Sequence, residues 1–532
     1  MALSRLTRLL LLALIIAVGA GCNGGKPKPR ENDLVHIQSR TKPHSKKVIV
    51  FVADSLMYQS IDKGLELGKL PTFKLLVERG QYYKNLVSSF PTMSVTIDSS
   101  LLTGTYPDRH RVPGLIWYAE DEKRIVNYGT GSIEVLRQGA GAVLDDALVR
   151  LNGDHLSKRT PTIYERLRKQ GRTSASVNGL IYRGDTGHVL TIPKWMQASV
   201  PLPEKIRVQG PDFMTFGALS NPLEGMKRLP DNVAGNLGFN NEFAIGTVAY
   251  LIEQRKLPDF TYVYLPDQDH ELHKKGPSHL DGLIKLDGQL QRVLQAFGSP
   301  EAAQEQAVIL IVGDSGMSSI LPRSGNPVID LTDLFQRYAI MRPGETASQK
   351  TDIALAVNET MAYVYNLKPG RSIKELVREL QREPRIGLIS WKEGKWIHVA
   401  RPGSGSEFKY KPGGRAKDEY GQKWTLGPNA ALLDVKVDLR KHVSYGQYPD
   451  GLRRLYGALH SHDGEFIVIT AKQGYEFTGH SSPKHRGGGG HGSLHETESI
   501  VPLIVYGTDR KPERLRIVDL QSYILNLLRV EE

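Results

Sequence analysis

The segment KKVIVFVADS, residues 46–55, is a continuous apolar run that ends in Asp54. A run of this length predicts a β-strand that is buried on both faces, as in a parallel sheet. The same pattern returns in FTYVYLPDQD (260–269) and AVILIVGDSG (307–316). In open α/β sheets, ligands bind at the carboxyl ends of the strands. We therefore expect the acidic residues that follow these strands to meet at one edge of a sheet, namely Asp54, Asp267, Asp269 and Asp314.

Segments with helical periodicity alternate with these strands. TPTIYERLRKQG (160–171), NEFAIGTVAYLIEQRK (241–256) and HLDGLIKLDGQLQRVLQAF (279–297) predict helices, and SASVNGL (174–180) predicts a further strand. Alternating strands and helices over this length indicate the α/β class. We expect a central, mostly parallel sheet that is flanked by helices.

Two long stretches depart from this alternation. Residues 181–240 are rich in proline and glycine and are expected to form an insertion or cap over the sheet edge. Residues from about 385 to 470 form a second irregular block with hairpin-like pieces. The chain of 532 residues is longer than one small core needs, so residues 46–532 are expected to form one large domain with these insertions, or two lobes.

The first residues read as a targeting segment. MALSRLTR carries two arginines, an apolar run follows, and small residues precede Cys22, which is typical of a signal peptide over residues 1–22. Cys22 is the only cysteine, so no internal disulfide is expected. Its position resembles that of the lipid-modified cysteine of bacterial lipoproteins, although Gly19 stands where that family usually has leucine. Residues 23–45 then read as a polar tether.

We expect an enzyme outside the cytoplasm, in the membrane or envelope, held by a lipid anchor on Cys22; simple secretion and an uncleaved anchor are the alternatives. The formal charge of +12, or +10 without residues 1–22, fits anionic substrates or envelope polymers, and it also fits plain solubility. No basic helix or recognised nucleic-acid-binding module is present in the sequence, so a nucleic-acid partner is not expected.

Hydroxyls and histidines add to the acidic edge. FPTMSVTIDSSLLTG (90–104) is dense in serine and threonine. In DQDHELHKKGP (267–277), Asp269 and His273 have the spacing i, i+4, which puts both side chains on one face of a helix. GGGGHGSLHETESIVPLIVYG (487–507) supplies His491 and His495 before another apolar strand. Carboxylates and imidazoles that converge from distant segments are typical of a metal site.

Together these segments resemble the alkaline phosphatase superfamily, and most closely its type I phosphodiesterase / nucleotide pyrophosphatase family. That family carries an aspartate after its first strand, an F-P-T-x-T stretch followed by T-G and Y-P-x-x-H-G, and an Asp-x-x-x-His-x-x-Gly-Pro motif. It also carries Asp-His-Gly-Met after a buried strand and a late His-Gly. The matching segments run in the family's order from Asp54 to His491 and span most of the chain after its leader.

The resemblance implies an alkaline phosphatase-like fold with two divalent metal ions, usually zinc, at the carboxyl edge of the sheet. It implies that Ser94 is the nucleophile, which attacks phosphorus and forms a covalent phospho-enzyme that water then hydrolyses. Asp54, Asp314 and Ser94 match the ligands of the first metal, and Asp269, His273 and His491 match those of the second. Thr92 and Thr96 are the fallback nucleophiles, and a helix N-cap is the alternative role for Ser94.

The sequence departs from the family where Asp-His becomes Asp314-Ser315, which removes an imidazole from the first metal. Three explanations stay open. Ser315 or water fills the place, giving an oxygen-rich site that accepts Mn²⁺ or Mg²⁺ better. Another histidine replaces the missing one, with these candidates: His270, His480, His485 and His495. Alternatively the site is weakened, and the protein binds its ligand without turning it over.

A second departure affects the substrate. Leu115 stands where the nucleotide pyrophosphatases place a phosphate-binding asparagine, which puts nucleotide-diester specificity in doubt. We expect a metal-dependent hydrolase of small-molecule or envelope phosphoesters, of the phosphodiesterase or phosphatase type. A phosphoglycerol-type transferase, a phosphonate hydrolase on the same fold, and a non-catalytic binding lipoprotein are the alternatives.

Overall fold

The computed structural model describes residues 46–129, 135, 137–197, 202–480 and 482–529. The predicted signal peptide, Cys22 and the tether lie outside the described residues. Within the described ranges, no helix is both long enough and apolar enough to cross a membrane.

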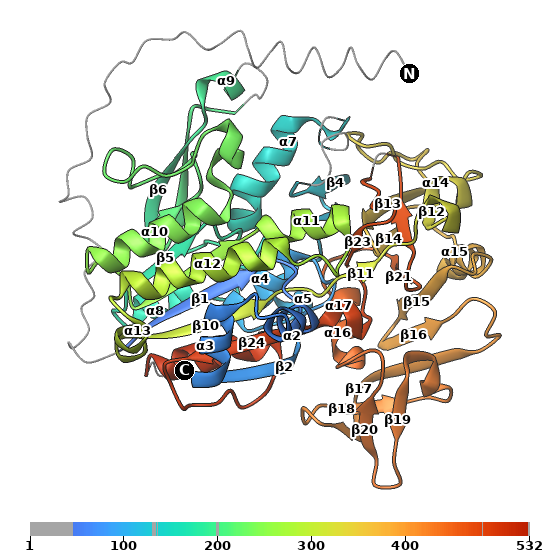
Figure 1. Cartoon of the computed structure of the whole chain (residues 1–532). Helices are drawn as coiled ribbons and strands as arrows, with labels where there is room; N and C mark the ends of the chain where they lie inside the picture. Colours follow the sequence, from blue (N-terminus) through green and yellow to red (C-terminus); the bar gives the residue numbers. More distant parts are fainter. Residues whose placement is uncertain (1–45, 130–134, 136, 198–201, 481, 530–532) are drawn as a thin grey trace.

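A seven-stranded sheet forms the centre of the molecule (Figure 1). Its strands lie in the order β2 (Gln81–Val87), β24 (Ile500–Tyr506), β10 (Ala307–Gly313), β1 (Lys47–Ala53), β9 (Phe260–Leu265), β5 (Ser174–Val177) and β8 (Phe213–Thr215). The strands from β10 to β8 pair in parallel, and β24 runs antiparallel to β10 and β2. The three apolar runs of the sequence are therefore neighbours, with β1 between β10 and β9. This arrangement confirms the expected α/β fold with a mostly parallel central sheet.

Strand β1 feeds two hydrophobic cores, because successive side chains of a strand point to opposite faces. Val48, Val50 and Val52 pack on one face with α4 (Ser94–Thr103), α8 (Ile163–Lys169) and α18 (Leu520–Leu527). Ile49 and Phe51 pack on the other with α10 (Asn241–Glu253) and α12 (Asp281–Ala296), which lie over that face of the sheet in Figure 1. This two-sided burial explains why the run has no polar alternation.

The predicted helices over 160–171, 241–256 and 279–297 are confirmed as α8, α10 and α12. Helix α8 begins after Thr162, whose hydroxyl accepts from the Glu165 amide while the Glu165 carboxylate accepts from the Thr162 amide. This reciprocal pair satisfies two amides that the first turn of a helix otherwise leaves free. Gly171, just beyond the helix, has φ +67°, a conformation that favours glycine.

A second sheet of nine strands lies beside the central one. Its strands are β13 (Ile353–Asn358), β14 (Met361–Asn366), β15 (Ile386–Glu393), β16 (Trp396–Ala400), β17 (Glu407–Asp418), β18 (Lys423–Leu426), β19 (Val435–Val437), β20 (His442–Tyr445) and β21 (Phe466–Ala471). Helices α15 (Ile373–Leu380) and α16 (Gly451–Leu459) cover its two faces. The block expected to be irregular at 385–470 therefore consists largely of regular strands, and their sheet begins earlier, at Ile353.

Residues 181–240 also differ from the expected cap. They contain the hairpin β6 (Thr186–Thr191) and β7 (Lys205–Gly210), but also β8, which pairs with β5 as the edge strand of the central sheet. A strand of three residues is too short to give a periodic signal in the sequence.

Shorter elements complete the described chain. They are α2 (Tyr58–Glu66), α3 (Pro71–Arg79), α5 (Pro107–His110), β3 (Ile116–Ala119), β4 (Arg124–Asn127), α7 (Ala140–Asp145), the π-helix η2 (Asp146–His155), α9 (Lys194–Gln197), η3 (Val233–Gly238), α11 (Asp267–Lys275), α13 (Pro300–Gln306), β11 (Ser318–Ser319), η4 (Arg323–Gly325), β12 (Val328–Asp330), α14 (Leu331–Leu334), η5 (Ala430–Leu433), β22 (Glu476–Thr478), β23 (Gly489–Gly490), α17 (Glu496–Ser499) and η6 (Ile517–Asp519).

Arg454 of α16 ties the second sheet to the central one. It is fully buried, and its guanidinium donates to the carbonyl oxygens of Ser89 at 3.0 Å and Leu494 at 3.2 Å and to the Ser499 hydroxyl at 2.7 Å. Ser89 precedes helix α4, and Leu494 lies three residues after His491. One side chain therefore fixes the approach to α4 and the segment that carries His491.

We expect Arg454→Met to lower the free energy of unfolding by roughly 2–5 kcal/mol, because buried oxygens lose their donors. The matched control is Arg440→Met, since Arg440 is exposed. Denaturant unfolding of both variants measures the difference. An Arg454→Met protein that is as stable as the control would show that these contacts do not hold the two sheets together.

Candidate metal centre

The first group of predicted site residues meets at the carboxyl edge of the central sheet. Asp54 follows β1, Asp314 follows β10, and Ser94 is the first residue of α4. The Ser94 Oγ lies 3.4 Å from Asp54 Oδ1 and 3.5 Å from Asp54 Oδ2. Met93 occupies the N-cap position of α4, so Ser94 stands inside the helix as its first residue. The hydroxyl therefore faces the carboxylates, and the alternative role as a helix N-cap does not apply.

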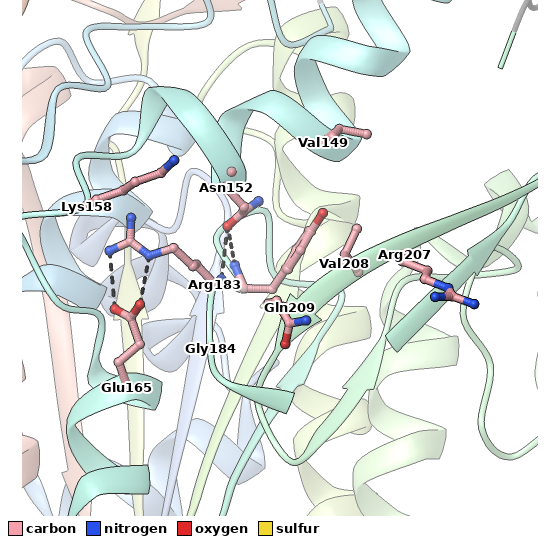
Figure 2. A pocket seen from close by; sticks show the side chains of 11 residues that line it. Val149, Asn152, Lys158, Glu165, Arg183, Gly184, Arg207, Val208 and Gln209 are labelled. Carbon is pink, nitrogen blue, oxygen red and sulfur yellow. Dashed lines mark hydrogen bonds and ion pairs between the residues drawn. The ribbon is translucent and has the colours of Figure 1, made fainter. Parts of the chain in front are cut away.

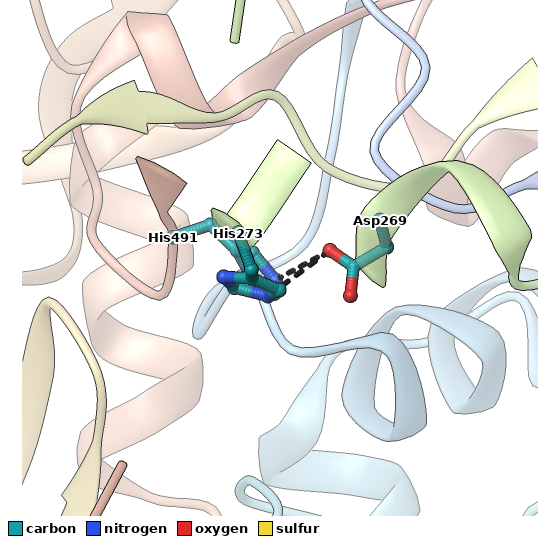
Figure 3. A group of neighbouring side chains, drawn as sticks. All are labelled: Asp269, His273 and His491. Carbon is teal, nitrogen blue, oxygen red and sulfur yellow. Dashed lines mark ion pairs between the residues drawn. The ribbon is translucent and has the colours of Figure 1, made fainter. Parts of the chain in front are cut away.

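The second group comes together beside the first. Asp269 and His273 lie one turn apart on α11, and His491 follows β23. The Nε2 atoms of His273 and His491 lie 3.2 Å and 3.4 Å from the same oxygen, Asp269 Oδ1, as Figure 3 shows. One ligand atom from each residue falls within 4.8 Å of the others. The structure therefore brings together the three residues predicted to hold the second metal.

A backbone carbonyl oxygen orients each of the two rings, His273 and His491, through its Nδ1 atom. His273 Nδ1 donates to the Gly489 carbonyl oxygen at 2.8 Å, and His491 Nδ1 donates to the Thr92 carbonyl oxygen at 2.6 Å. A carbonyl only accepts, so Nδ1 carries a hydrogen in each ring, and Nε2 is the nitrogen that offers a lone pair once the ring is neutral. A histidine that binds a metal through one nitrogen usually donates its other N–H in this way.

Glycines make the close approach around His491 feasible. A Cβ on Gly488 would lie 2.0 Å from the His273 carbonyl oxygen, and one on Gly492 would lie 2.4 Å from the Asn358 carbonyl oxygen. Gly492 also has φ +130°. The glycine-rich run was expected to let the backbone approach a ligand closely; here it approaches α11 and the β13–β14 turn.

Ser55 links the two groups, and the sequence alone did not single it out. Its backbone amide donates to Asp314 Oδ1 at 2.9 Å, and its hydroxyl donates to Asp269 Oδ1 at 2.8 Å. It adopts a left-handed conformation with φ 56°, which is uncommon outside glycine and marks a constrained position. Its place directly after Asp54 was the available signal.

The carboxylates repel one another. Burial raises the pKa of Asp54 well above its usual value, and the neighbouring Asp314 and Asp269 raise it further, although Tyr264 donates a hydrogen bond to it. Burial also raises the pKa of Asp314. Asp314 Oδ2 is buried and has no hydrogen-bond partner in the described part of the chain. Buried carboxylates without a compensating charge are suited to a cation.

The two groups differ in their donor atoms. Asp54, Asp314 and Ser94 offer oxygen only, which suits Mg²⁺ or Mn²⁺ as well as zinc, whereas Asp269, His273 and His491 offer one oxygen and two nitrogens, which suits Zn²⁺. The residues present therefore fit a pair of divalent cations, one of them nitrogen-coordinated.

The carboxylates hold the histidines in their charged form when no metal is bound. Burial opposes the charge on both rings, but Glu359 and Asp269 outweigh it and raise the pKa of His273 and of His491 to about 10. Burial alone would raise the pKa of Asp269, yet the neighbouring His273 and His491 lower it well below its usual value.

None of the proposed replacements for the missing imidazole reaches the first group. His270 is exposed and contacts Lys274, the exposed His480 accepts a hydrogen bond from Arg137 through its backbone carbonyl, and His495 starts α17 and bonds Thr497. His485 packs against His273 instead, with ring centroids 4.4 Å apart. Among the described residues, no hydrogen bond or ion pair joins these histidines to Asp54 or Asp314. His270 and His495 are therefore not brought into the centre.

Ser315 does lie at the centre. It is fully buried, its backbone amide donates to Asp314 Oδ1 at 2.6 Å, and its hydroxyl lies 3.3 Å from the Ser55 hydroxyl. The environment of Asp54 and Asp314 is thus built from oxygen atoms. Of the three explanations for the lost imidazole, this geometry favours the oxygen-rich site.

Thr92 and Thr96 have other partners. The Thr92 hydroxyl accepts from the Gly492 amide at 2.8 Å and donates to the Ser493 carbonyl oxygen at 3.2 Å, so it holds the His491 segment. Thr96 is fully buried. Neither hydroxyl contacts the carboxylates as Ser94 does.

Several cavities of the described part of the chain lie away from this centre. One of about 390 Å³ is bounded by η2 and the β7 strand, where Arg183 pairs with Glu165 and Asn152 accepts from the backbone, as Figure 2 shows. None of the residues of the metal centre lines it.

Comparisons with known proteins identify the family and the fold. A sequence profile of the type I phosphodiesterase / nucleotide pyrophosphatase family matches residues 48–494. An inactive form of murine ectonucleotide pyrophosphatase / phosphodiesterase 5 in complex with AMP is 14% identical, with a TM-score of 0.54 over 92% of this chain and 96% of that one.

Phosphonoacetate hydrolase from Sinorhizobium meliloti 1021 in complex with phosphonoacetate is 17% identical, with a TM-score of 0.54 over 91% of this chain and 96% of that one. At these identities the likeness shows the fold. The comparison with curated protein sequences found no significant match.

Metal binding near neutral pH should release about two protons, because His273 and His491 are both charged in the metal-free protein and must lose a proton to bind. The affinity should therefore rise with pH until the pH passes about 10, where both rings are already neutral. Calorimetric zinc titrations in buffers of different ionisation enthalpy measure the number of protons. Release of none would show that the rings are neutral before the metal binds.

Proposed function

The chain belongs to the type I phosphodiesterase / nucleotide pyrophosphatase family, and we propose that it hydrolyses phosphoesters through a covalent intermediate on Ser94, at a centre of two divalent cations. As a member of this family, the protein is a hydrolase that acts on phosphoric ester bonds. Membership in a family of enzymes argues against a non-catalytic binding lipoprotein, which Ser315 and Leu115 had left open.

One observation carries the assignment of Ser94. Its hydroxyl is the one in α4 that faces the carboxylates, 3.4 Å from Asp54, and it stands at the first residue of a ten-residue helix. A helix N-terminus favours an anionic ligand, so the phosphoryl group that a nucleophile must receive is stabilised where Ser94 stands. By comparison, Ser99 and Ser100 donate to backbone carbonyls of their own helix.

The proposed reaction has two displacements at phosphorus. Ser94 Oγ gives its proton to solvent and forms a bond to phosphorus while the bond to the leaving oxygen breaks, and the leaving group gains a proton from solvent. Water then attacks the phosphoserine, the Oγ–phosphorus bond breaks, and Ser94 regains its proton. The two cations, when bound, lower the pKa of the attacking hydroxyl and of water and balance the charge on the phosphoryl oxygens.

The chain's own residues set up these steps. Tyr264 donates to Asp54 and fixes the carboxylate that faces Ser94. Ser55 holds Asp314 through its amide and Asp269 through its hydroxyl, so the two cation positions keep one spacing. We assign the first cation to Asp54, Asp314 and Ser94, with Mg²⁺ or Mn²⁺ accepted there, and a zinc ion to Asp269, His273 and His491.

The substrate we propose is a small phosphoester, of the phosphodiester or phosphomonoester type, or an envelope phosphoester. The fold neighbours were solved with AMP and with phosphonoacetate, so a phosphonate is the second candidate. Leu115, at the family's asparagine position, is partly buried and its amide donates to Asn358, so its side chain offers no hydrogen bond to a phosphate. A transferase that uses an alcohol acceptor instead of water would give a different product from the same intermediate.

The location and domain limits stay predictions from the sequence. An enzyme anchored through Cys22 on a tether over 23–45, with its catalytic domain over 46–532, would meet substrates of the envelope or the surrounding medium. The basic net charge, +10 without residues 1–22, suits anionic substrates of that kind.

Ser94→Ala should lower kcat/KM for bis-p-nitrophenyl phosphate and p-nitrophenyl phosphate by a factor on the order of 10³ or more, because the nucleophile is lost. Zinc at Asp269, His273 and His491 should stay bound, since Ser94 is not among its ligands. Initial rates and metal analysis of the purified variant measure the two effects.

Ser99→Ala is the matched control, since Ser99 lies in the same helix and only bonds the Val95 carbonyl. Intact-mass analysis of wild type after rapid acid quenching should show one added phosphoryl group, and Ser94→Ala should show none. Turnover by Ser94→Ala at the wild-type rate would remove Ser94 from the mechanism.

Ser315→His should raise the zinc affinity of the Asp54/Asp314 position, because it adds a nitrogen donor where the site now has oxygen only. The preference among Zn²⁺, Mn²⁺ and Mg²⁺ should shift toward zinc, measured as activity of the metal-stripped enzyme after addition of each ion. A preference that matches wild type would show that residue 315 does not reach the cation.

A further inference from the structure

A second set of metal-binding side chains lies against the centre, and no motif of the family accounts for it. Glu359 stands at the turn between β13 and β14, and His485 lies in the loop between β22 and β23. Glu359 Oε1 is 3.6 Å from His273 Nε2, and the His485 ring packs against the His273 ring with centroids 4.4 Å apart. Ligand atoms of the three residues fall within 4.8 Å of one another.

His485 is oriented for metal binding in the same way as His273 and His491. Its Nδ1 lies 3.0 Å from Glu476 Oε2, and its backbone amide donates to both carboxylate oxygens of Glu476. Glu476 is fully buried on β22. A carboxylate accepts the hydrogen of Nδ1, so the lone pair of His485 is on Nε2, for which no hydrogen bond is found in the described part of the chain.

Glu359 is also held in place by its neighbours. It has φ 58°, a left-handed conformation that is unfavourable for a residue other than glycine and persists where the surroundings impose it. On one side, Asn358 Oδ1 accepts from the Leu115 amide; on the other, the Thr360 amide donates to the His491 carbonyl oxygen.

The two carboxylate oxygens of Glu359 face different groups. Oε2 accepts from the backbone amide of His491 at 3.1 Å. This contact leaves Oε1 toward His273, at a distance longer than a hydrogen bond. The side chain is 17% exposed, so it is not sealed off from solvent.

We propose that His273, Glu359 and His485 form a further divalent-cation position beside the proposed catalytic centre. Two imidazole nitrogens and one carboxylate, with a fourth place left open, are a zinc-type donor set. The proposal shares His273 with the proposed function but concerns binding, so it stands or falls independently of Ser94.

Sharing His273 has a consequence for occupancy. One nitrogen lone pair binds one ion, so an ion held by Glu359 and His485 takes His273 away from Asp269 and His491. At low zinc, one nitrogen-coordinated ion occupies one of the two positions. At high zinc, a second ion binds, with Asp269 and His491 left to hold the inner one.

The test removes the inner position and asks whether a nitrogen-coordinated ion survives. Asp269→Asn with His491→Gln leaves the three residues of the new position in place. This double variant, metal-stripped and loaded with Co²⁺, should keep the intense visible absorption of a low-coordinate, nitrogen-bound ion. Adding Glu359→Gln or His485→Gln should weaken zinc binding, measured against a chromogenic chelator, by more than the roughly 10- to 100-fold cost of losing an outer partner.

A second arm uses the otherwise unaltered protein, so that misfolding of the double variant does not decide the result. At saturating zinc, Glu359→Gln and His485→Gln should each bind one equivalent fewer than wild type, measured by elemental analysis after gel filtration. The matched controls Glu305→Gln and His495→Gln lie outside the cluster and should bind as wild type does. Equal stoichiometry in all five proteins, or no nitrogen-bound Co²⁺ in a folded double variant, would overturn the proposal.

Discussion

The structure around the centre depends on the mutual repulsion of buried carboxylates. Three strands of the central sheet deliver Asp54, Asp314 and, through α11, Asp269 to one edge. Burial raises the pKa of Asp54 there, and Asp314 and Asp269 raise it further. Hydrogen bonds from Ser55 and Tyr264 meet only part of this charge. Divalent cations would compensate the rest in the function we propose, and they would make the hydroxyl of Ser94 a competent nucleophile.

The second sheet supplies polar side chains to the carboxyl edge of the central sheet, in addition to packing contacts. Arg454 joins α16 to the segments before Ser94 and after His491, and the β13–β14 turn brings Glu359 against His273. The centre therefore has two chemically different ends. Ser315 leaves oxygen donors around Asp54 and Asp314, while histidines and carboxylates gather around Asp269. With Ser315 in place of a histidine at the Asp314 end, and His485 beside His273 at the other end, the centre is suited to hold two different cations.

The sequence predicts the centre wherever the fold rules are strict. Parallel strands place their carboxyl ends at one edge, so the acids after β1, β9 and β10 could be brought together from three apolar runs. The i, i+4 spacing on α11 likewise joined Asp269 to His273. His491 followed from the resemblance of its His-Gly segment to the family. These residues lie close together because the backbone geometry of parallel strands and of a helical turn places them there.

Other features depend on tertiary packing that no local pattern reveals. Glu359 lies on a hairpin turn of the second sheet, and only the docking of that sheet brings it to His273. The segment 385–470 was expected to be irregular because glycines in β17, at Gly413 and Gly414, and short strands interrupt the alternation from which strands are predicted. His485 was one of several candidates for the Asp314 end, and the loop after β22 carries it to the other end instead.

We propose that Ser94 faces a cation held by Asp54 and Asp314, with a second, nitrogen-coordinated cation nearby. Anomalous diffraction from crystals grown with zinc and manganese tests it most directly. We expect one peak in contact with Ser94 Oγ, Asp54 and Asp314, and a zinc peak in contact with His273. A fully loaded crystal with no cation in contact with Ser94 Oγ would contradict it.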